Sequence, residues 1–255
     1  MSNMISANTI AEVAALIGDV ARAGILSALM GGRALTAGEL ARIAGVTAQT
    51  ASGHLAKLFE ARLVLVEKQG RHRYYRLASP EVADAMQSLM TLAAAAPARH
   101  HPIGPRDAAL RLARTCYDHM AGRLAVAVAD NLAERGFIVF AEGAGLVTDE
   151  GHRFFCDFGL TPEEEKSSKR PLCRTCLDWS ERRSHIGGRL GAQLLTHCLD
   201  RGWLIRAPEG RALTITRKGE AGFADTFLLP SDWRDEPVAL PRLSALISRG
   251  ETPDR

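Results

Sequence analysis

Residues 46–58 read VTAQTASGHLAKL, and this stretch decides the fold. Thr47 is expected to cap the start of a helix, because a threonine oxygen accepts a hydrogen bond from a free backbone N–H of the first turn. The helical period then places Ala51, Leu55 and Leu58 on one face. The opposite face is polar. One side of this helix is therefore expected to pack on a core while the other stays exposed.

A shorter helix is predicted directly before it, within and after the sequence LTAGEL of residues 35–40. Thr36 and Glu39 have the spacing of a capping box, in which each side chain satisfies a backbone N–H at the start of a helix. Gly45 is expected to end this helix. Two short helices joined by residues 45–47 make a helix-turn-helix unit. The inward apolar residues of the first of them are expected to be Leu40, Ile43 and Ala44.

A β-hairpin is predicted immediately after the second helix. Residues 63–67 have the β-branched and apolar content of a strand, residues 69–70 form a turn, and residues 71–77 return. A hairpin at this place is the wing of a winged helix. Arg71 and Arg73 are two residues apart in a strand, so they project to the same side and can reach phosphates or a minor groove.

The basic charge is concentrated in this region. The chain has 255 residues, is 46% hydrophobic and 24% charged, and carries a net charge of only +3. Between residues 42 and 76, however, seven basic residues stand against two acidic ones. Such a pattern is typical of a single face that meets a polyanion. The seven are Arg42, Lys57, Arg62, Lys68, Arg71, Arg73 and Arg76.

Helical segments flank the unit on both sides. Residues 10–30 keep a helical spacing of apolar side chains, and a further hydrophobic helix opens at residues 79–81. Both are too apolar for lone surface helices. They are expected to form the surface through which the chain pairs with a second copy of itself.

The second half of the chain repeats itself. HMAGRL at residues 119–124 matches HIGGRL at residues 185–190, and at the same offset ERGFI at 134–138 matches DRGWL at 200–204. Each unit is predicted to consist of a long helix, a short strand, a returning strand and a last helix. The repeat therefore predicts a duplicated α+β domain.

All five cysteines lie between residues 116 and 198, in the C-terminal part of the chain that contains this repeat. Their odd number, and a start that lacks the pattern of a signal peptide, predict a cytoplasmic protein with reduced thiols. The longest uncharged stretch, residues 85–98, is too short and too polar for a membrane span. The motifs of dinucleotide, phosphate-loop, serine-hydrolase and zinc-protease sites are missing from the sequence, so an enzyme is not expected.

Residues 10–90 resemble the ArsR/SmtB family of winged-helix repressors. The resemblance is carried by the two stretches quoted above, at residues 35–40 and 46–58, and by QGRHRYYRL at residues 69–77. It covers about a third of the chain. It implies a homodimer that sits on a palindromic operator in double-stranded DNA and leaves it when a chemical signal binds.

The sequence departs from the metal-sensing members of that family. They carry a cysteine pair on the first helix of the motif and an Asp/His set on the last helix, whereas here residues 35–40 have no thiol and residues 80–92 have no histidine. The usual metal sites of the family are therefore absent. Sensing is expected in the C-terminal part, which is similar to an extension carried by longer family members.

The predicted fold class is mainly α with small β structure (α+β), an N-terminal winged helix-turn-helix followed by a duplicated, winged-helix-like α+β domain. Residues 1–95 form the expected DNA-binding and dimerisation domain, and residues 96–106 a proline-containing linker. Residues 107–235 form the expected effector-sensing or dimer-stabilising domain, and residues 236–255 a tail.

The helix-turn-helix and the wing supply the candidate DNA contacts. Gln49 can pair with adenine, and Lys57 can neutralise a phosphate. His54 adjoins the packed face, so it suits a buried hydrogen-bonded histidine as well as a phosphate contact. A protein-interaction module with a solvated hairpin edge is the alternative. The candidate DNA-binding residues are Thr47, Gln49, Thr50, Ser52, His54, Lys57, Arg71 and Arg73.

The repeat also aligns cysteine with cysteine and histidine with histidine. TCYD at residues 115–118 matches TCLD at residues 175–178, and equivalent positions of a duplicated fold often face each other. Two thiolates and two imidazoles suit a thiophilic metal such as zinc in tetrahedral geometry. In the first unit, the cysteine and the histidine are expected to share a helix face. The candidate metal ligands are Cys116, His119, Cys176 and His185.

The CRTC sequence of residues 173–176 adds a second arrangement, since Cys173 and Cys176 can ligate a metal or form a disulfide. A single Cys-x-x-Cys is also found in purely structural contexts, and an organic ligand held between the two units is a further alternative. The effector or thiol candidates are Cys116, His119, Cys173, Cys176 and His185.

The sequence thus predicts a dimeric, sequence-specific DNA-binding regulator, a repressor released from its operator by an effector that acts on the C-terminal domain. The effector is a small organic ligand, a metal or thiol oxidation. One alternative is a DNA-binding protein without small-molecule input, whose C-terminal domain only mediates oligomerisation or partner binding. Another is a cysteine-dependent enzyme fused to a winged helix.

Overall fold

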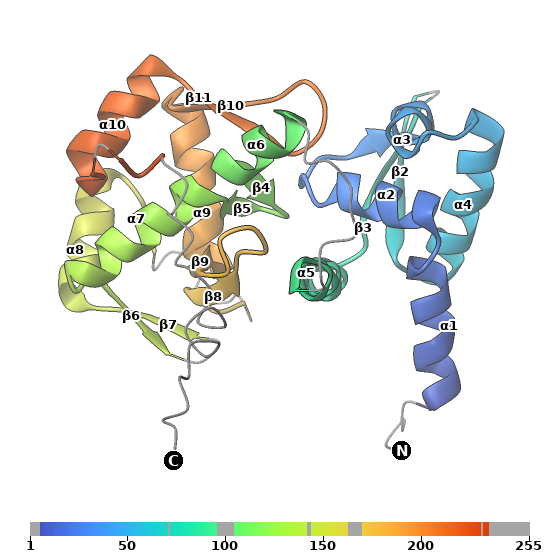
Figure 1. The fold of residues 1–255 in the computed structure, drawn as a ribbon, viewed down its shortest axis with the longest axis horizontal. Coiled ribbons are helices and arrows are strands. Elements are labelled where there is room, and N and C mark those ends of the chain that lie inside the picture. The colour runs from blue at the N-terminus through green and yellow to red at the C-terminus, as the bar shows by residue number, and fades with distance from the viewer. Residues whose placement is uncertain are drawn as a thin grey trace, which may run out of the picture.

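Helices and short strands alternate through the computed structural model and gather in two parts (Figure 1). The structure describes residues 6–70, 72–95, 105–141, 144–162, 170–230 and 232–234. Within these ranges the first part holds α1 to α5 with a three-stranded sheet, and the second holds α6 to α10 with four two-stranded hairpins. The predicted fold class, mainly helical with small sheets, is confirmed.

The first part is a winged helix-turn-helix, as predicted. The wing strands pair with each other, and a short strand before the helix-turn-helix joins them, so the sheet order is β1-β3-β2. The sequence analysis did not predict that third strand. The elements are α1 (Ala7–Ile17), α2 (Val20–Leu29), β1 (Leu35–Thr36), α3 (Ala37–Ala44), α4 (Ala48–Glu60), β2 (Val64–Gln69), β3 (His72–Leu77) and α5 (Pro80–Ala95).

The segment expected as one helix over residues 10–30 is two helices. α1 ends at Gly18, and Asp19 starts α2 by accepting a hydrogen bond from the backbone N–H of Arg22 at 2.9 Å. An aspartate at this place satisfies an N–H of a new helix start, and that breaks the run although the apolar spacing continues across it. Ile43, expected to face inward, is 38% exposed.

The second part contains the same order of elements twice. We call residues 114–158 the first unit and residues 174–227 the second unit. Each runs hairpin, helix, hairpin, helix, and α6 (Pro105–Leu112) precedes them. The first unit has β4 (Arg114–Cys116), β5 (His119–Ala121), α7 (Arg123–Glu134), β6 (Ile138–Ala141), β7 (Ala144–Val147) and α8 (Asp149–Phe158). The second has β8 (Arg174–Leu177), β9 (Ser184–Gly187), α9 (Gly188–Asp200), β10 (Leu204–Arg206), β11 (Leu213–Ile215) and α10 (Arg217–Phe227).

The hairpin at the start of each unit was not predicted. The sequence analysis placed residues 115–119 on a helix, but they lie in the β4–β5 hairpin, and Cys116 pairs across it with His119. A two-residue turn, Tyr117-Asp118, joins the strands, and Tyr117 has a positive φ of 61°. Strands of three residues are too short to show the alternation that identifies a strand in a sequence.

The expected linker differs at its end. α6 begins at Pro105, so residues 105–106 belong to a helix and not to the linker. Proline suits the first position of a helix, where its missing N–H costs nothing. Residues 96–104 and the predicted tail at residues 236–255 lie outside the described residues.

Two apolar cores hold the chain together. One fills the second part and takes helices from both units, with Leu124 and Leu190 at 0% exposure and three aromatic side chains, Phe155, Trp203 and Phe223, packed among them. The other is the core of the winged helix, and it includes Cys116 and Ala121 from the β4–β5 hairpin. A hairpin of the first unit therefore completes the core of the DNA-binding fold.

The backbone fixes this junction as well. The N–H of Tyr117, at the tip of the β4–β5 hairpin, donates to the carbonyl of Met30 at 2.7 Å. Gly32 lies beside it with a φ of 68°, and a Cβ there would come within 2.2 Å of the Tyr117 carbonyl oxygen. Only glycine allows that approach. In the part of the chain that the structure describes, no helix has the length and apolar character needed to span a membrane.

Candidate functional site

The helix α4 presents the polar face that the sequence predicts. Thr47 accepts a hydrogen bond from the Thr50 N–H at 3.1 Å, and this cap fixes where the helix begins. Three apolar residues of α4, Ala51, Leu55 and Leu58, are buried. The opposite face is exposed to solvent. It carries Gln49, Thr50, Ser52 and Lys57.

The wing hairpin also carries exposed cations. Arg73 of β3 is exposed and pairs across the hairpin with Lys68 of β2, which is exposed too. Two cations at neighbouring positions on one ribbon suit contact with a phosphate backbone. Arg71 lies outside the described residues. We call the exposed face of α4 together with Lys68 and Arg73 the basic face.

His54 lies away from the basic face. It is partly buried, and its Nδ1 is 3.8 Å from the Asp19 carboxylate and 3.4 Å from the Arg22 guanidinium at the start of α2. Arg42, counted among the basic residues of this segment, turns toward the second unit and forms an ion pair with Glu209. His54 thus connects two helices of the winged helix, and Arg42 connects the winged helix to the second part.

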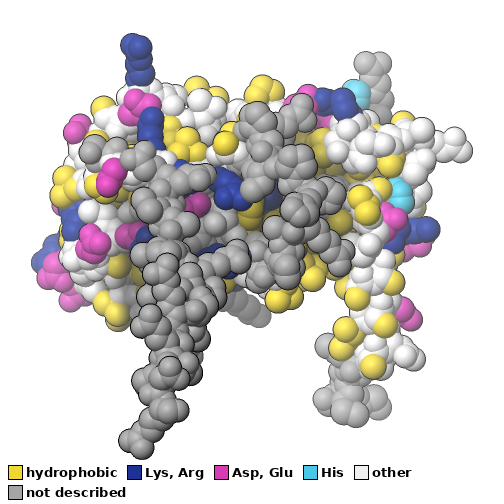
Figure 2. Space-filling model, viewed as in Figure 1, with side chains coloured by type: hydrophobic (Ala, Val, Ile, Leu, Met, Phe, Trp, Pro, Cys, Tyr) yellow, Lys and Arg dark blue, Asp and Glu magenta, His cyan; other side chains and the backbone are white. Residues whose placement is uncertain are grey.

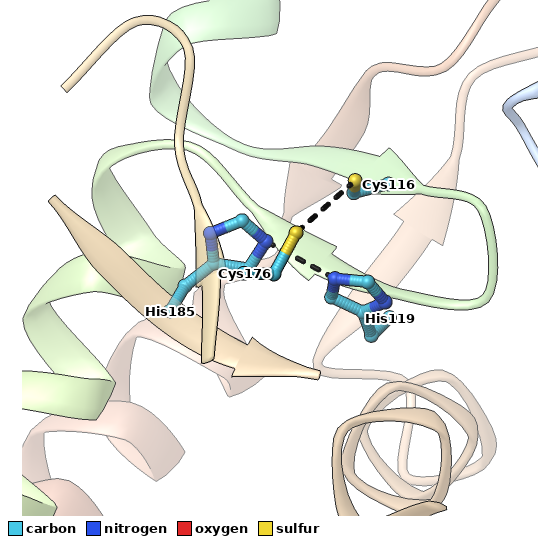
Figure 3. A group of neighbouring side chains, drawn as sticks. All are labelled: Cys116, His119, Cys176 and His185. Carbon is cyan, nitrogen blue, oxygen red and sulfur yellow. Dashed lines mark hydrogen bonds between the residues drawn. The ribbon is translucent and has the colours of Figure 1, made fainter. Parts of the chain in front are cut away.

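The four candidate metal ligands meet. Cys116 and His119 face each other across the β4–β5 hairpin, and Cys176 and His185 do the same across β8–β9. The two hairpins bring their side chains together (Figure 3). One ligand atom from each residue lies within 4.8 Å of all the others. The two Sγ atoms are 3.9 Å apart and the two Nε2 atoms 3.1 Å apart.

This Cys/His cluster, defined as those four residues, is largely buried. Cys116 and His119 are 2% exposed, His185 is 0% exposed and Cys176 is half-buried. Each residue reaches the cluster from a strand and not from the shared helix face that the sequence analysis expected for Cys116 and His119. Cross-strand pairing brings a cysteine and a histidine together as closely as helical spacing would.

An aspartate carboxylate lies near the Nδ1 atom of each of the two cluster histidines. Asp118 Oδ1 is 3.2 Å from His119 Nδ1, and Asp178 Oδ2 is 3.8 Å from His185 Nδ1. Arg170 forms an ion pair with Asp118, and Arg114 does so with Asp178. These aspartates are the fourth residues of the two TC-x-D repeats.

Both carboxylates are held in the ionised form. Burial alone would raise the pKa of Asp118, but hydrogen bonds from His119 and Arg170 lower it to about 2. Burial likewise opposes ionisation of Asp178, and the Arg114 charge, with help from His185, brings its pKa to about 2. Each histidine of the cluster therefore faces a negative charge on the side away from the other histidine.

Cys116 forms two hydrogen bonds, to Cys176 and to Gln87, that act in opposite directions on the protonation of its thiol. The hydrogen bond with Cys176 lowers the pKa of Cys116 against the opposing effect of burial, and His119 adds to the lowering. On its other side, the thiol donates to Gln87 Oε1 at 3.2 Å, a contact that needs the proton. That same hydrogen bond, together with burial, raises the pKa of Cys176.

Cys173 does not join the cluster. It is 5% exposed in the core of the second part, and burial raises the pKa of its thiol to about 11. A cysteine in that environment behaves as a small apolar side chain. The Cys-x-x-Cys spacing, which made Cys173 a thiol candidate, thus places its two cysteines in different surroundings.

Helix α5 of the winged helix contacts the cluster directly. Gln87 takes the Cys116 hydrogen bond and donates from Nε2 to the Leu177 carbonyl at 2.7 Å. One turn earlier, Asp84 forms two hydrogen bonds with Arg174, at 2.6 and 2.8 Å. The sequence analysis missed Gln87 and Arg114 because a single glutamine or arginine carries no local signal. The aspartates could have been found from the TC-x-D repeat.

Comparison with known proteins assigns the N-terminal motif. The family described as "Helix-turn-helix domain" matches residues 17–67. The chain is similar to the HTH-type transcriptional regulator YdfF of Bacillus subtilis (strain 168), with 44% identity over 214 residues, which is 84% of this chain and 95% of that protein. A regulator of this kind agrees with the lack of enzyme motifs in the sequence.

Solved structures match over a smaller share. The homodimeric winged helix-turn-helix DNA-binding domain Mb0332 from Mycobacterium bovis, described as a possible ArsR-family transcriptional regulator, is 24% identical, with 40% of this chain and 98% of that one covered and a TM-score of 0.34. NolR from Sinorhizobium fredii is 26% identical, with 34% and 85% covered and a TM-score of 0.32. The extensive match to YdfF carries the assignment, and by it the chain belongs to the helix-turn-helix transcriptional regulators.

Proposed function

We propose that the protein is a homodimeric repressor that holds a palindromic operator in double-stranded DNA and releases it when an effector acts on the second part of the chain. Its place of action is the cytoplasm. The observation that carries the proposal is the basic face, in which a capped helix exposes polar side chains beside two wing cations.

The chemistry of the basic face suits DNA. A glutamine amide can donate and accept toward the edge of an adenine, which Gln49 offers from the first turn of α4. Lys57, Lys68 and Arg73 can replace counterions on phosphates, a contribution that is independent of sequence and falls steeply with salt. The face therefore combines base reading with backbone binding.

The dimer is proposed from the first helix. α1 projects from the rest of the chain, as Figure 1 shows, and buries none of its residues. Its Ile10 is 61% exposed, and Figure 2 shows apolar side chains along this projecting helix. On α5, Leu89 and Leu92 are 42% and 68% exposed. Two apolar helix faces on one DNA-binding module fit a second copy, which would place two recognition helices about one turn of DNA apart.

The effector part of the proposal rests on α5. This helix offers apolar side chains for the dimer and is bound through Asp84 and Gln87 to the second unit. A change in the second part that moves α5 would alter the spacing of the two recognition helices. A bias of a few kcal/mol between two such arrangements is enough to change operator occupancy.

Fluorescence anisotropy with DNA upstream of the protein's own gene tests the DNA-binding proposal. We expect binding that is at least ~1,000-fold tighter than to a scrambled duplex, the lower end for specific regulators, and that weakens steeply from 50 to 200 mM salt. The outcome that overturns the proposal is equal affinity for both duplexes at every salt concentration.

Light scattering tests the dimer separately. The intact protein is expected to have twice the chain mass, and Ile10→Glu to reduce it toward one chain mass, because a charge in an apolar interface is costly. Glu12→Gln on the same helix is the matched control. A monomer that still binds the full operator would contradict the dimer.

A further inference from the structure

We infer that Cys116, His119, Cys176 and His185 bind one thiophilic divalent cation, zinc or an ion of the same preference, and that this ion is the effector of the proposed regulator. That the four residues bind an ion is inferred from the geometry of the cluster alone. That this ion is the effector rests on the proposed function.

The distances within the cluster are those of a tetrahedral site. Zinc lies about 2.3 Å from a thiolate and about 2.0–2.1 Å from an imidazole nitrogen, so the edges of the tetrahedron are roughly 3.8 Å between sulfurs and 3.3 Å between nitrogens. The Sγ atoms of the cluster are 3.9 Å apart and the Nε2 atoms 3.1 Å apart. The remaining ligand atoms lie within 4.8 Å of one another, so closing the site around an ion would draw some of them together by up to about 1 Å.

The orientation of the two histidines also suits the binding of a cation. Asp118 faces Nδ1 of His119, which favours the tautomer with the proton on Nδ1. Nδ1 of His185 is buried without a hydrogen bond and has Asp178 as its nearest carboxylate. The two Nε2 atoms are 3.1 Å apart, which is hydrogen-bonding distance, and an ion between them would replace that hydrogen bond with two metal–nitrogen bonds. Carboxylates behind the ligating histidines are the usual outer support of such an ion.

The other chemistries of the same groups fit less well. A disulfide has its sulfurs about 2.05 Å apart, and forming one from the 3.9 Å separation would leave the facing histidines unused. A nucleophile needs access to substrate, whereas Cys116 and both histidines are almost closed to solvent. A cation needs neither a large cavity nor a path for an organic molecule.

Ion binding reaches α5 through the Cys116 proton. Each thiol releases its proton to solvent when it ligates, and the hydrogen between the two Nε2 atoms must also leave or move to Nδ1, because both rings bind through a free Nε2. Cys116 then no longer donates to Gln87 Oε1, and a thiolate lies 3.2 Å from a carbonyl oxygen. Relief of that contact requires the Gln87 amide to move, which also disturbs its hydrogen bond to the Leu177 carbonyl.

Titration of the reduced full-length protein with Co²⁺, after removal of bound metal by a chelator, tests the site. We expect saturation at one ion per chain, the visible absorption of a tetrahedral thiolate complex, and displacement by Zn²⁺. Cys116→Ser and Cys176→Ser should each bind Co²⁺ more weakly and with reduced thiolate absorption, and the double variant should lose it. Cys156→Ser, at an exposed free thiol on α8, is the matched control and should keep it. The measurement on the wild-type protein does not depend on whether any variant folds. If the wild type shows no saturable Co²⁺ binding, the proposed site is wrong.

Operator affinity of the same metal-free and Zn²⁺-loaded samples tests the regulation. We expect Zn²⁺ to weaken operator binding roughly 5- to 150-fold, the usual size of coupling between two sites. Gln87→Ala should still bind one Co²⁺ per chain but show a smaller response. Equal affinity with and without Zn²⁺ would leave the ion structural and overturn its role as effector. If neither sample distinguishes the operator from scrambled DNA, the proposed function fails while the metal result stands.

Discussion

Arg114 and Asp178 form an ion pair that is closed to water and joins the two units. The guanidinium of Arg114, in β4, donates to the Asp178 carboxylate at 2.8 Å, and the two side chains are 1% and 0% exposed. Arg114 also stacks on the ring of Trp179, with its central carbon 4.5 Å from the ring centroid. The same carboxylate accepts from the Gly122 N–H at 2.6 Å, at the start of α7.

Breaking the Arg114–Asp178 ion pair is expected to lower the free energy of unfolding substantially. Arg114→Met leaves a buried carboxylate, and Asp178→Asn leaves a buried guanidinium, so each is expected to lower the free energy of unfolding by about 3–5 kcal/mol. Urea unfolding with a chelator present measures this without a contribution from bound metal. The double variant should lose less than the sum. Arg153→Met, at the exposed pair with Glu150, is the control and should cost at most ~1 kcal/mol. Single variants with equally small losses would show that the buried pair contributes little.

Two glycines at equivalent places in the units should be intolerant of alanine. A Cβ at Gly151 would lie 2.1 Å from the Phe137 carbonyl oxygen, and one at Gly219 would lie 2.1 Å from that of Trp203. Gly151→Ala and Gly219→Ala are each expected to cost about 1–3 kcal/mol, because the helix must move away from the chain it touches. Thermal unfolding measures the loss. Gly38→Ala, in open space on α3, should instead leave stability unchanged or raise it. A loss at Gly38 that matches the other two would contradict this explanation.

The basic face should separate base reading from phosphate binding. Gln49→Ala is expected to weaken operator binding by about 1–3 kcal/mol and to change binding to scrambled DNA little. Arg73→Ala should weaken both and reduce the slope of log affinity against log salt by about 1. Lys218→Ala, an exposed cation on α10, is the matched control. Anisotropy titrations at several salt concentrations distinguish these effects, and equal losses on both DNAs for Gln49→Ala would remove its role in base reading.

The capping box of α3 should weaken in acid. Hydrogen bonds from the backbone and the hydroxyl of Thr36 hold the pKa of Glu39 below its ordinary value of 4.5. A carboxyl whose pKa is lower in the folded state stabilises fully above its unfolded pKa and loses that contribution as pH falls through the folded pKa. Glu39→Ala is therefore expected to cost about 0.3–1 kcal/mol at pH 7 and progressively less below about pH 4.5. Urea unfolding at several pH values measures it. A cost that stays constant down to pH 3 would exclude the ionised carboxylate as the cause.

The parts of the fold with strong local signals could be predicted from the sequence. α3 and α4 carry their own caps at Thr36 and Thr47, and their apolar spacing is regular, so neighbours in the chain decide them. The β4–β5 and β8–β9 hairpins could not be predicted, because strands of three or four residues acquire their pairing only in the folded chain. Asp19 divided a helix that apolar spacing alone would have continued.

The sequence predicted that the four residues of the Cys/His cluster meet, although it did not predict the strands that carry them. The repeat aligned Cys116 with Cys176 and His119 with His185, and this alignment brings them together whether the residues lie on helices or strands. Gln87 could not be found in this way. Its partner Cys116 is 29 residues away along the chain, and a glutamine on a helix gives no indication of a distant hydrogen bond.

The tip of the β4–β5 hairpin has two neighbours at once. On one side its strands carry Cys116 and His119 toward β8–β9, and on the other the N–H of Tyr117 is bound to the Met30 carbonyl, with Gly32 in close contact. We therefore propose that this hairpin couples the Cys/His cluster to the winged helix. A rotation of the hairpin would then displace α4, which lies on the opposite side of the winged helix from β4 and β5 in Figure 1. In the proposed regulator, α4 would respond to an ion in the cluster without touching it.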